Sequence, residues 1–189
     1  MVLEKINITA NYSGVAEGIR MDDYEGEGSI TLSGVKIDVT GKHTTTSYSP
    51  RAMGAEGSTV ITVGNYSDAF PLVVTVTNEA TSPNGYAYAF DVDAGTAKYI
   101  INGGTFTMNA AGRAAVVNGQ YSTSSYANIY GGYFTLNSSS GVNSVGYSDK
   151  NATVYGGYFN IDPSASAPDG YAAVTAADGK PSPTATPIR

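Results

Sequence analysis

One short phrase occurs three times in the second half of the chain, and it restricts the fold more than any other feature. Each copy reads apolar, any, Gly, Gly, any, aromatic, any, apolar, and the first glycines of successive copies lie 28 and 25 residues apart. Repeats of roughly 20 to 50 residues indicate stacked units, each too small to bury its own hydrophobic face. The copies are INGGTFTM from Ile101, IYGGYFTL from Ile129 and VYGGYFNI from Val154.

Two weaker copies extend the array toward the N-terminus, LSGVKIDV from Leu32 and ITVGNYSD from Ile61. Each unit holds an apolar strand that runs into the glycines, a second short strand, a polar loop and a third short apolar strand. The third strands are expected near Val117 and Val145, which each follow the repeat phenylalanine by eleven residues, and near Val174. In the N-terminal half SPRAMGAEG and GYAYAFDVD take this role, and the phrase NEATSPNG lengthens one loop.

Three short strands per unit, separated by glycine-rich bends, predict an all-β chain folded as a right-handed parallel β-helix of about six coils. Parallel strands need a connection, which the rest of the coil supplies. A β-sandwich gives no reason for aligned Gly-Gly-x-aromatic repeats, and propeller blades are longer, with four strands each. We expect residues 1–179 to form the β-helix and the Pro/Thr/Ser-rich residues 180–189 to form a tail or linker.

Side-chain alternation along a strand divides the repeat into two faces. The repeat phenylalanines and the apolar residues two places later are expected to point inward, coil over coil, while the residues between them point outward. The paired glycines are expected at a bend, where one takes a positive φ and the missing Cβ lets coils approach. The inward set is Phe106, Phe134, Phe159, Met108, Leu136 and Ile161.

The composition excludes several classes of function. The net charge is −6, and the ten Lys and Arg residues are scattered singly, so the chain lacks the clustered cations that nucleic acids require. No cysteine is present, which excludes disulfides, thiolate metal sites and cysteine nucleophiles. No stretch approaches the roughly 18 apolar residues of a membrane span. We therefore expect no nucleic-acid partner and no membrane-spanning segment.

The acidic residues and the single histidine offer little for catalysis. His43 stands in a polar loop and has no second histidine or cysteine with which to build a metal site or a nucleophile pair. Residues 22–27 (DDYEGE) are expected to form a solvated acidic turn, with an adventitious calcium site as the alternative. Asp91 and Asp93 have a spacing that suits one cation, but on a strand the same alternation puts both on the solvent face. The sequence predicts no catalytic residue, no metal and no cofactor.

Two further phrases follow the last repeat, DPS from Asp162 and GYA from Gly170. Together with the Gly-Gly-[Thr/Tyr]-Phe coils, they resemble the β-helical repeats of bacterial surface and phage-associated proteins with a pectin-lyase-like fold. The resemblance covers roughly residues 29–180 and is a repeat signature, not a catalytic one. It implies the β-helical fold and an extracellular, virion or cell-surface setting, and it does not imply an enzyme.

Tyrosines recur at two outward positions of the repeat. Tyr130 and Tyr155 precede the glycines, and Tyr133 and Tyr158 follow them. Flat amphipathic rings on a rigid face suit contacts with sugar rings and with protein surfaces, because they offer contact area at low entropy cost. Aromatic ladders also stabilise stacked strands without any ligand. These four tyrosines are the candidate ligand-binding residues, and both interpretations stay open.

The ends of an open β-helix expose unpaired backbone that natural proteins cap or pair. The segment KINITANYS is expected to be an edge strand that awaits a partner. We therefore expect self-association, as a filament or trimer, or continuation of the coils into a longer array.

Together these features favour a non-catalytic structural and adhesive module. It would belong to a phage virion fibre or decoration, or to a bacterial surface filament, and would contact a surface glycan or protein receptor. The N-terminal residues show no leader peptide, which favours a virion protein assembled in the cytoplasm. The alternatives are a polysaccharide lyase or glycoside hydrolase of the same fold, or a carbohydrate-binding module. An enzyme needs at least two acids with Arg or Lys on one face. We expect no such group, because the repeated outward positions are Tyr, Thr, Asn and Ser.

Overall fold

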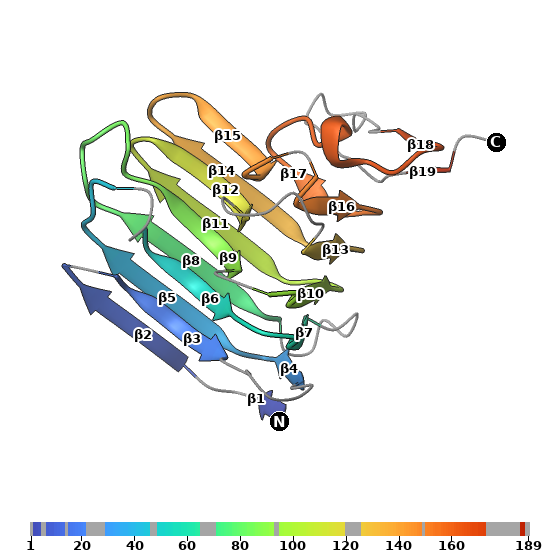
Figure 1. The fold of residues 1–189 in the computed structure, drawn as a ribbon, viewed down its shortest axis with the longest axis horizontal. Helices are drawn as coiled ribbons and strands as arrows, with labels where there is room; N and C mark the ends of the chain where they lie inside the picture. Colours follow the sequence, from blue (N-terminus) through green and yellow to red (C-terminus); the bar gives the residue numbers. More distant parts are fainter. Residues whose placement is uncertain are drawn as a thin grey trace.

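The computed structural model of the chain describes residues 2–4, 7–13, 15–21, 29–45, 49–64, 71–92, 95–119, 126–148, 150–172 and 186–187. Nearly all of the strands in these ranges belong to three stacked parallel sheets (Figure 1). The first sheet contains β1 Val2–Glu4, β4 Ser29–Ser33, β7 Val60–Val63, β10 Lys98–Ile101, β13 Ala127–Ile129 and β16 Ala152–Val154.

The second sheet has the longest strands, and the third sheet lies beside it. The second sheet contains β2 Asn7–Tyr12, β5 Lys36–Gly41, β8 Val73–Asn78, β11 Thr105–Ala110, β14 Tyr133–Ser138 and β17 Tyr158–Phe159. The third sheet contains β3 Glu17–Met21, β6 Arg51–Ala55, β9 Ala87–Val92, β12 Arg113–Asn118 and β15 Val142–Gly146.

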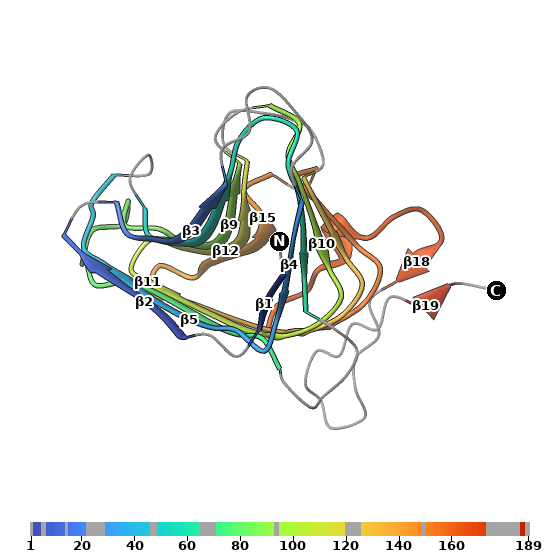
Figure 2. The same ribbon diagram turned by 90° about the horizontal axis from the view of Figure 1, so that it is seen from below.

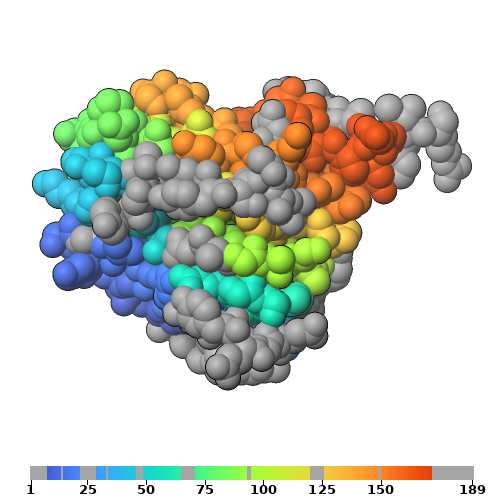
Figure 3. Space-filling view, in the orientation of Figure 1, coloured from blue at the N-terminus to red at the C-terminus, as the bar shows by residue number. Residues whose placement is uncertain are grey.

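Each of the first five coils contributes one strand to each sheet, so hydrogen-bonded neighbours within these three sheets are three strands apart in the chain. Seen from the N-terminal end, the coils superimpose around a common interior and wind in a right-handed sense (Figure 2). In the space-filling view, successive parts of the chain form layers from blue to red (Figure 3). The prediction of an all-β parallel β-helix with three strands per coil and about six coils is confirmed. Five coils have all three strands, and the sixth has β16 and β17.

The inward residues of the second sheet form the predicted ladder. Phe106, Phe134 and Phe159 pair in register and are buried. Their rings stack with centroids 4.8 and 4.5 Å apart and interplanar angles of 5° and 12°. Met108 and Leu136 form the next buried row, and Ile161 packs against it while partly buried. The apolar surface that these rows remove from water is the main stabilising contribution to the stack.

The paired glycines turn the chain from the first sheet into the second, and the two members of each pair have different roles. The second members, Gly104, Gly132 and Gly157, have φ angles of 123°, 119° and 117°, a region that side-chain-bearing residues rarely adopt. The first members lie against the preceding coil. A Cβ on Gly131 would be 2.8 Å from the Asn102 carbonyl oxygen. The predicted bend is confirmed, and both conformation and space require glycine.

The third sheet differs from the prediction in register and in burial. Val117 pairs with Gly146, not with the expected Val145, because the loop before β15 (139–141) is one residue longer than the loop before β12 (111–112). Its strands also bend: adjacent residues such as Ala89 and Phe90 both belong to the core. The bend leaves a concave outer face, and β6 and β9 are buried along their whole length.

The C-terminal end of the second sheet is closed by local hydrogen bonds. The side-chain amide of Asn160 accepts a hydrogen bond from the Leu136 amide at 2.8 Å and donates one to the Leu136 carbonyl at 2.9 Å, as a further strand would. Asp162 then begins the turn η2, Ser164–Ser166. Its carboxylate accepts hydrogen bonds from the Ser164 hydroxyl and, at 2.9 Å, from the Ser164 amide. These bonds lower the pKa of Asp162 below its ordinary value.

Beyond η2, β18 Tyr171–Ala172 pairs antiparallel with β19 Thr186–Pro187. The strand expected near Val174 lies outside the described residues, as does the tail segment apart from β19. At the N-terminal end, the expected edge strand is present: β2 is the terminal strand of the second sheet. No helix among the described residues is long and apolar enough to cross a membrane.

The phenylalanine stack predicts a large effect of Phe134→Ala. We expect the free energy of unfolding to fall by about 3 to 5 kcal/mol, because the substitution removes a ring buried between two others. Tyr133→Ala, one residue away on the outward face, is the matched control and should cost about 1 kcal/mol. Urea unfolding followed by circular dichroism measures both. Equal losses would contradict the assignment of the core.

The glycine bend predicts that Gly132→Ala destabilises the chain more than Gly141→Ala. Both residues have positive φ, but the φ of 77° at Gly141 lies near the left-handed region, where a side chain costs about 1 kcal/mol, whereas the φ of 119° at Gly132 lies far from it. Only at Gly132 would the new Cβ also meet neighbours, the Gly104 carbonyl oxygen at 3.1 Å and the Phe134 ring. At Gly141 nothing lies within 4 Å. The difference between the two melting temperatures measures the combined effect of backbone conformation and close coil packing at the bend, and identical values would argue against both.

Candidate functional site

Two columns of tyrosine flank the glycine bend on the last two coils. Tyr130 and Tyr155 stack with ring centroids 4.9 Å apart, and Tyr133 and Tyr158 do the same, also at 4.9 Å. Their interplanar angles are 9° and 8°. The structure therefore brings the four predicted site residues together at one corner, where the first and second sheets meet. Tyr171 adds an edge-on contact to Tyr155.

The orientation of these rings decides what they can bind. Within each column the rings lie face to face, so one face of every ring is already occupied by its neighbour. The register partner of Tyr133 on the preceding coil is Thr105, whose short side chain cannot cover a phenol ring. The face of Tyr133 toward that coil is thus open to solvent, and 59% of the residue is exposed. Tyr133 forms a ledge above Thr105.

The outward face of the second sheet continues from this ledge as rows of small polar side chains. Thr75, Thr107 and Thr135 form one row, in register. The next row runs through Thr77, Asn109 and Asn137. The Asn137 amide donates to the Asn109 side-chain oxygen at 2.9 Å, and the Asn109 amide donates to the Thr77 hydroxyl at 3.2 Å. Across β8, β11 and β14 this face carries no charged side chain.

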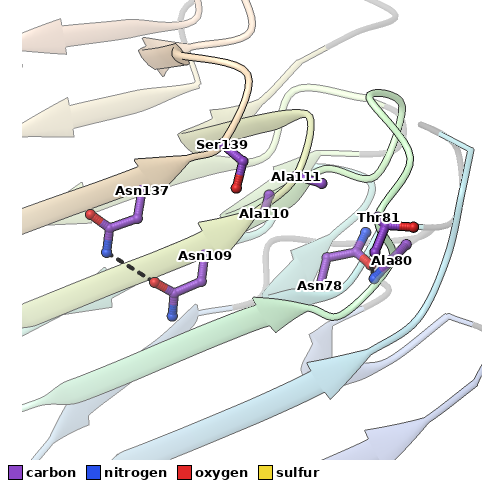
Figure 4. Close-up of a pocket in the computed structure, with 8 residues that line it drawn as sticks. All are labelled: Asn78, Ala80, Thr81, Asn109, Ala110, Ala111, Asn137 and Ser139. Carbon is purple, nitrogen blue, oxygen red and sulfur yellow. Dashed lines mark hydrogen bonds between the residues drawn. The ribbon is translucent and has the colours of Figure 1, made fainter.

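A hollow of about 400 Å³ lies at the C-terminal ends of β8, β11 and β14 (Figure 4). It exists because the connection 79–86 after β8 is longer than the connections after β11 and β14, so this loop projects and forms a wall. All of its polar lining groups are amides and hydroxyls. The lining residues are Asn78, Ala80, Thr81, Asn109, Ala110, Ala111, Asn137 and Ser139.

The wall of the hollow is held in place by Asn78. Its side-chain amide donates to the carbonyl oxygens of His43 and Tyr86, at 3.0 and 2.9 Å, and its oxygen accepts from the amides of His43 and Ala80. A single buried side chain thereby ties together the loops of two successive coils. Asn78 is a structural residue. The side-chain groups left for a ligand are the amide oxygen of Asn137 and the hydroxyls of Thr81 and Ser139, which have no hydrogen-bond partner in the described part of the chain.

The outer face of the third sheet carries a network of charges. Arg51 pairs with Asp91 and lies 3.3 Å from Glu17, measured from Nε to Oε1. Arg20 pairs with Glu56 and lies 3.5 Å from Glu17. The amide of Asn118 donates to Asp91 at 2.7 Å.

Two predictions are wrong here. Asp91 was expected on a solvent face, but it is 1% exposed, because the bend of the third sheet places it in a covered concave corner. Acids and arginines do gather on one face, whereas no such group was expected. Buried partners of opposite charge satisfy one another, so the pairing of Arg51 with Asp91 supports the bent sheet.

The other candidate residues from the sequence are His43, the acidic residues 22–27 and Asp93. His43 is half-buried in its loop, and its Nδ1 faces the Thr45 hydroxyl at 3.1 Å. Residues 22–27 and Asp93 lie outside the described residues. In the part of the chain that the structure describes, no group of three or more His, Asp or Glu side chains is arranged to hold a metal ion.

Sequence reasoning found the tyrosine columns and missed the hollow. Asn109 and Asn137 lie two residues beyond outward positions that alternation had already identified, so the outward parity pointed to them. The loop insertion NEATSPNG was visible as well, but not which strands it would stand over. Comparison of the chain with protein families, with curated proteins and with solved structures finds no match. The function is therefore argued from the geometry.

The charge network predicts that Asp91→Ala is strongly destabilising. The substitution leaves the Arg51 guanidinium buried without its main partner, which should cost about 3 to 5 kcal/mol. The double variant Arg51→Met/Asp91→Leu should recover most of that loss, because it removes both charges. A double-mutant cycle by urea unfolding, with Arg51→Met and Asp91→Leu as the single variants, measures the coupling. Additive effects of the two single substitutions would show that the pair is not coupled.

Proposed function

We propose that the protein is a non-catalytic, rigid module for adhesion and assembly, of the kind found in phage virion fibres or decorations or in bacterial surface filaments. The observation that carries the proposal is the outward face of the second sheet, where uncharged polar side chains and stacked tyrosines repeat in register across the coils. Such a face is rigid before it binds, so little conformational entropy is lost on contact. Its setting would be extracellular, on a virion or a cell surface.

Self-association belongs to the same proposal, and the two ends of the stack differ in their capacity for it. At the C-terminal end, Asn160 occupies the backbone groups of Leu136 that a further strand would use. At the N-terminal end, β2 has a hydrogen-bonded neighbour on one side only among the described strands. Tyr12 in this strand is 63% exposed. A second copy would therefore add to the stack at β2, by strand addition.

A charge placed on this edge should prevent the addition of a second copy. We expect Thr9→Lys to shift the protein toward monomer, because an edge lysine opposes strand pairing. Thr75→Lys is the matched control, since Thr75 occupies the same outward row in the middle of the sheet. Size-exclusion chromatography with light scattering gives the mass of each. A wild-type protein that stays monomeric at high concentration would overturn the assembly part of the proposal.

A carbohydrate-active enzyme of the same fold is the second candidate, and the charge network of the third sheet is the observation that favours it. The network contains three acids and two arginines on one sheet, but each acid contacts an arginine. The test is release of reducing or unsaturated ends from neutral and acidic polysaccharides. We expect no release above background. Product formation that is lost in Arg20→Gln, the most exposed member of the network, would establish the enzyme instead.

A further inference from the structure

We propose that the hollow beside Asn109 and Asn137, together with the Tyr133 ledge, is a binding site for an uncharged glycan that lies along β11. The inference rests on the proposed adhesive function and gives it a ligand class. In this arrangement Thr105, Thr107 and Asn109 form the floor of the site. Tyr133 borders it at one end, and the loop 79–86 borders it at the other.

The chemistry of the lining suits sugar hydroxyls. A carboxamide presents an acceptor oxygen and a donor nitrogen side by side, which matches two neighbouring hydroxyls that each donate and accept. Asn137 is exposed, and its oxygen has no partner in the described part of the chain, since only its amide nitrogen bonds to Asn109. The Thr81 hydroxyl adds a further donor and acceptor across the hollow. Both side chains are available to a ligand without breaking any bond that the structure shows.

Charge selects the class of glycan. The chain has a net charge of −6, yet the outward positions of β8, β11 and β14 are Val, Thr, Asn and Tyr. The charges of β5 on the same face, Lys36 and Asp38, pair with each other at 2.7 Å, and the exposed charge in the loop 79–86 is an acid, Glu79. An acidic polymer would meet no cation here to offset its desolvation and would be repelled by the protein as a whole. A neutral chain of sugars has no charge to desolvate, and the amides and hydroxyls of this surface can replace the hydrogen bonds that its hydroxyls make to water.

The dimensions of the site fit an oligosaccharide. Four residues along an extended strand separate Thr105 from Asn109, a distance of about 13 Å. A sugar ring at the Thr105 end can stack on the open face of Tyr133, and the amides at the other end can bond the hydroxyls of a later ring. Tyr130 lies on the other side of the glycine bend and does not border this strip. The site thus uses one tyrosine column and leaves the other for a different contact.

The test is isothermal titration calorimetry of the full chain with three probes. These are cello-oligosaccharides and manno-oligosaccharides, which are neutral, and oligogalacturonate, which is acidic. We expect a neutral probe to bind and oligogalacturonate not to bind. Binding of the acidic probe alone, or of none of the three, would overturn the proposal.

The variants locate the site. Asn137→Asp preserves the shape and introduces a charge, and Thr81→Val removes a hydroxyl at constant shape. Each substitution should lower the affinity for the neutral probe roughly tenfold or more. Asn11→Asp is the matched control, because Asn11 continues the row of Asn137 in the first coil, far from the hollow. It should bind as the wild type does. If Asn137→Asp lowers the melting temperature, Thr81→Val still tests the binding site, because the Thr81 side chain is exposed in a loop.

Tyr133→Ala should abolish stacking and lower the affinity for the neutral probe, whereas Tyr130→Ala should leave that affinity unchanged. Equal affinity in Asn137→Asp, Thr81→Val and wild type would overturn the site. Failure of this inference is distinguishable from failure of the proposed function. If no glycan binds but copies still assemble at β2, the glycan site is wrong and the proposed assembly module stands. If the protein releases reducing or unsaturated ends from polysaccharides, the proposed non-catalytic function is wrong.

Discussion

The in-register stacking of one coil on the next is the constraint on which the rest of the structure depends. Because parallel strands hold equivalent residues about 4.8 Å apart, every position of the repeat becomes a column along the axis. Inward columns must be filled by side chains that stack on copies of themselves, as Phe106, Phe134 and Phe159 do. Outward columns form regular surfaces as a direct result of the same stacking. The same backbone geometry thus produces both the core and the face that could meet a partner.

The sequence allowed the fold and one of its sheets to be predicted, because the signal there repeats. The Gly-Gly-x-Phe phrase shows period, bend and side-chain direction together, and the second sheet follows it residue by residue. The third sheet could not be predicted in the same way. Its loops vary in length from coil to coil, which shifts the register by one. Its strands also bend where two neighbouring residues both face the core, and the bend covers Asp91, which was expected to be exposed.

The site shows the same division. Alternation predicts which columns face outward, so the tyrosines were found, but it does not predict that their rings would stack face to face. Because the rings stack, only a ring at the end of a column exposes a face to solvent. The candidate contact is therefore the ledge at Tyr133 and not all four tyrosines. The hollow depends on a difference between coils: one loop is long and the next two are short. A departure from the repeat, not the repeat itself, creates the cavity, and its position follows only from the three-dimensional stacking.

The two halves of the functional proposal support each other through the strength of the contacts involved. A surface of amides, hydroxyls and one exposed phenol ring face would give modest affinity for a single glycan, because each hydrogen bond replaces one to water. Repeated copies raise the effective concentration of the site without any new contact. Because Asn160 closes the other end of the second sheet, addition at the β2 edge would join two copies through the same strand, as a two-fold pair that carries two neutral strips. The charges of the third sheet lie on another face and pair with one another. Under the proposed function, assembly at this edge would be the means by which a weak, rigid and uncharged surface becomes an adhesive one.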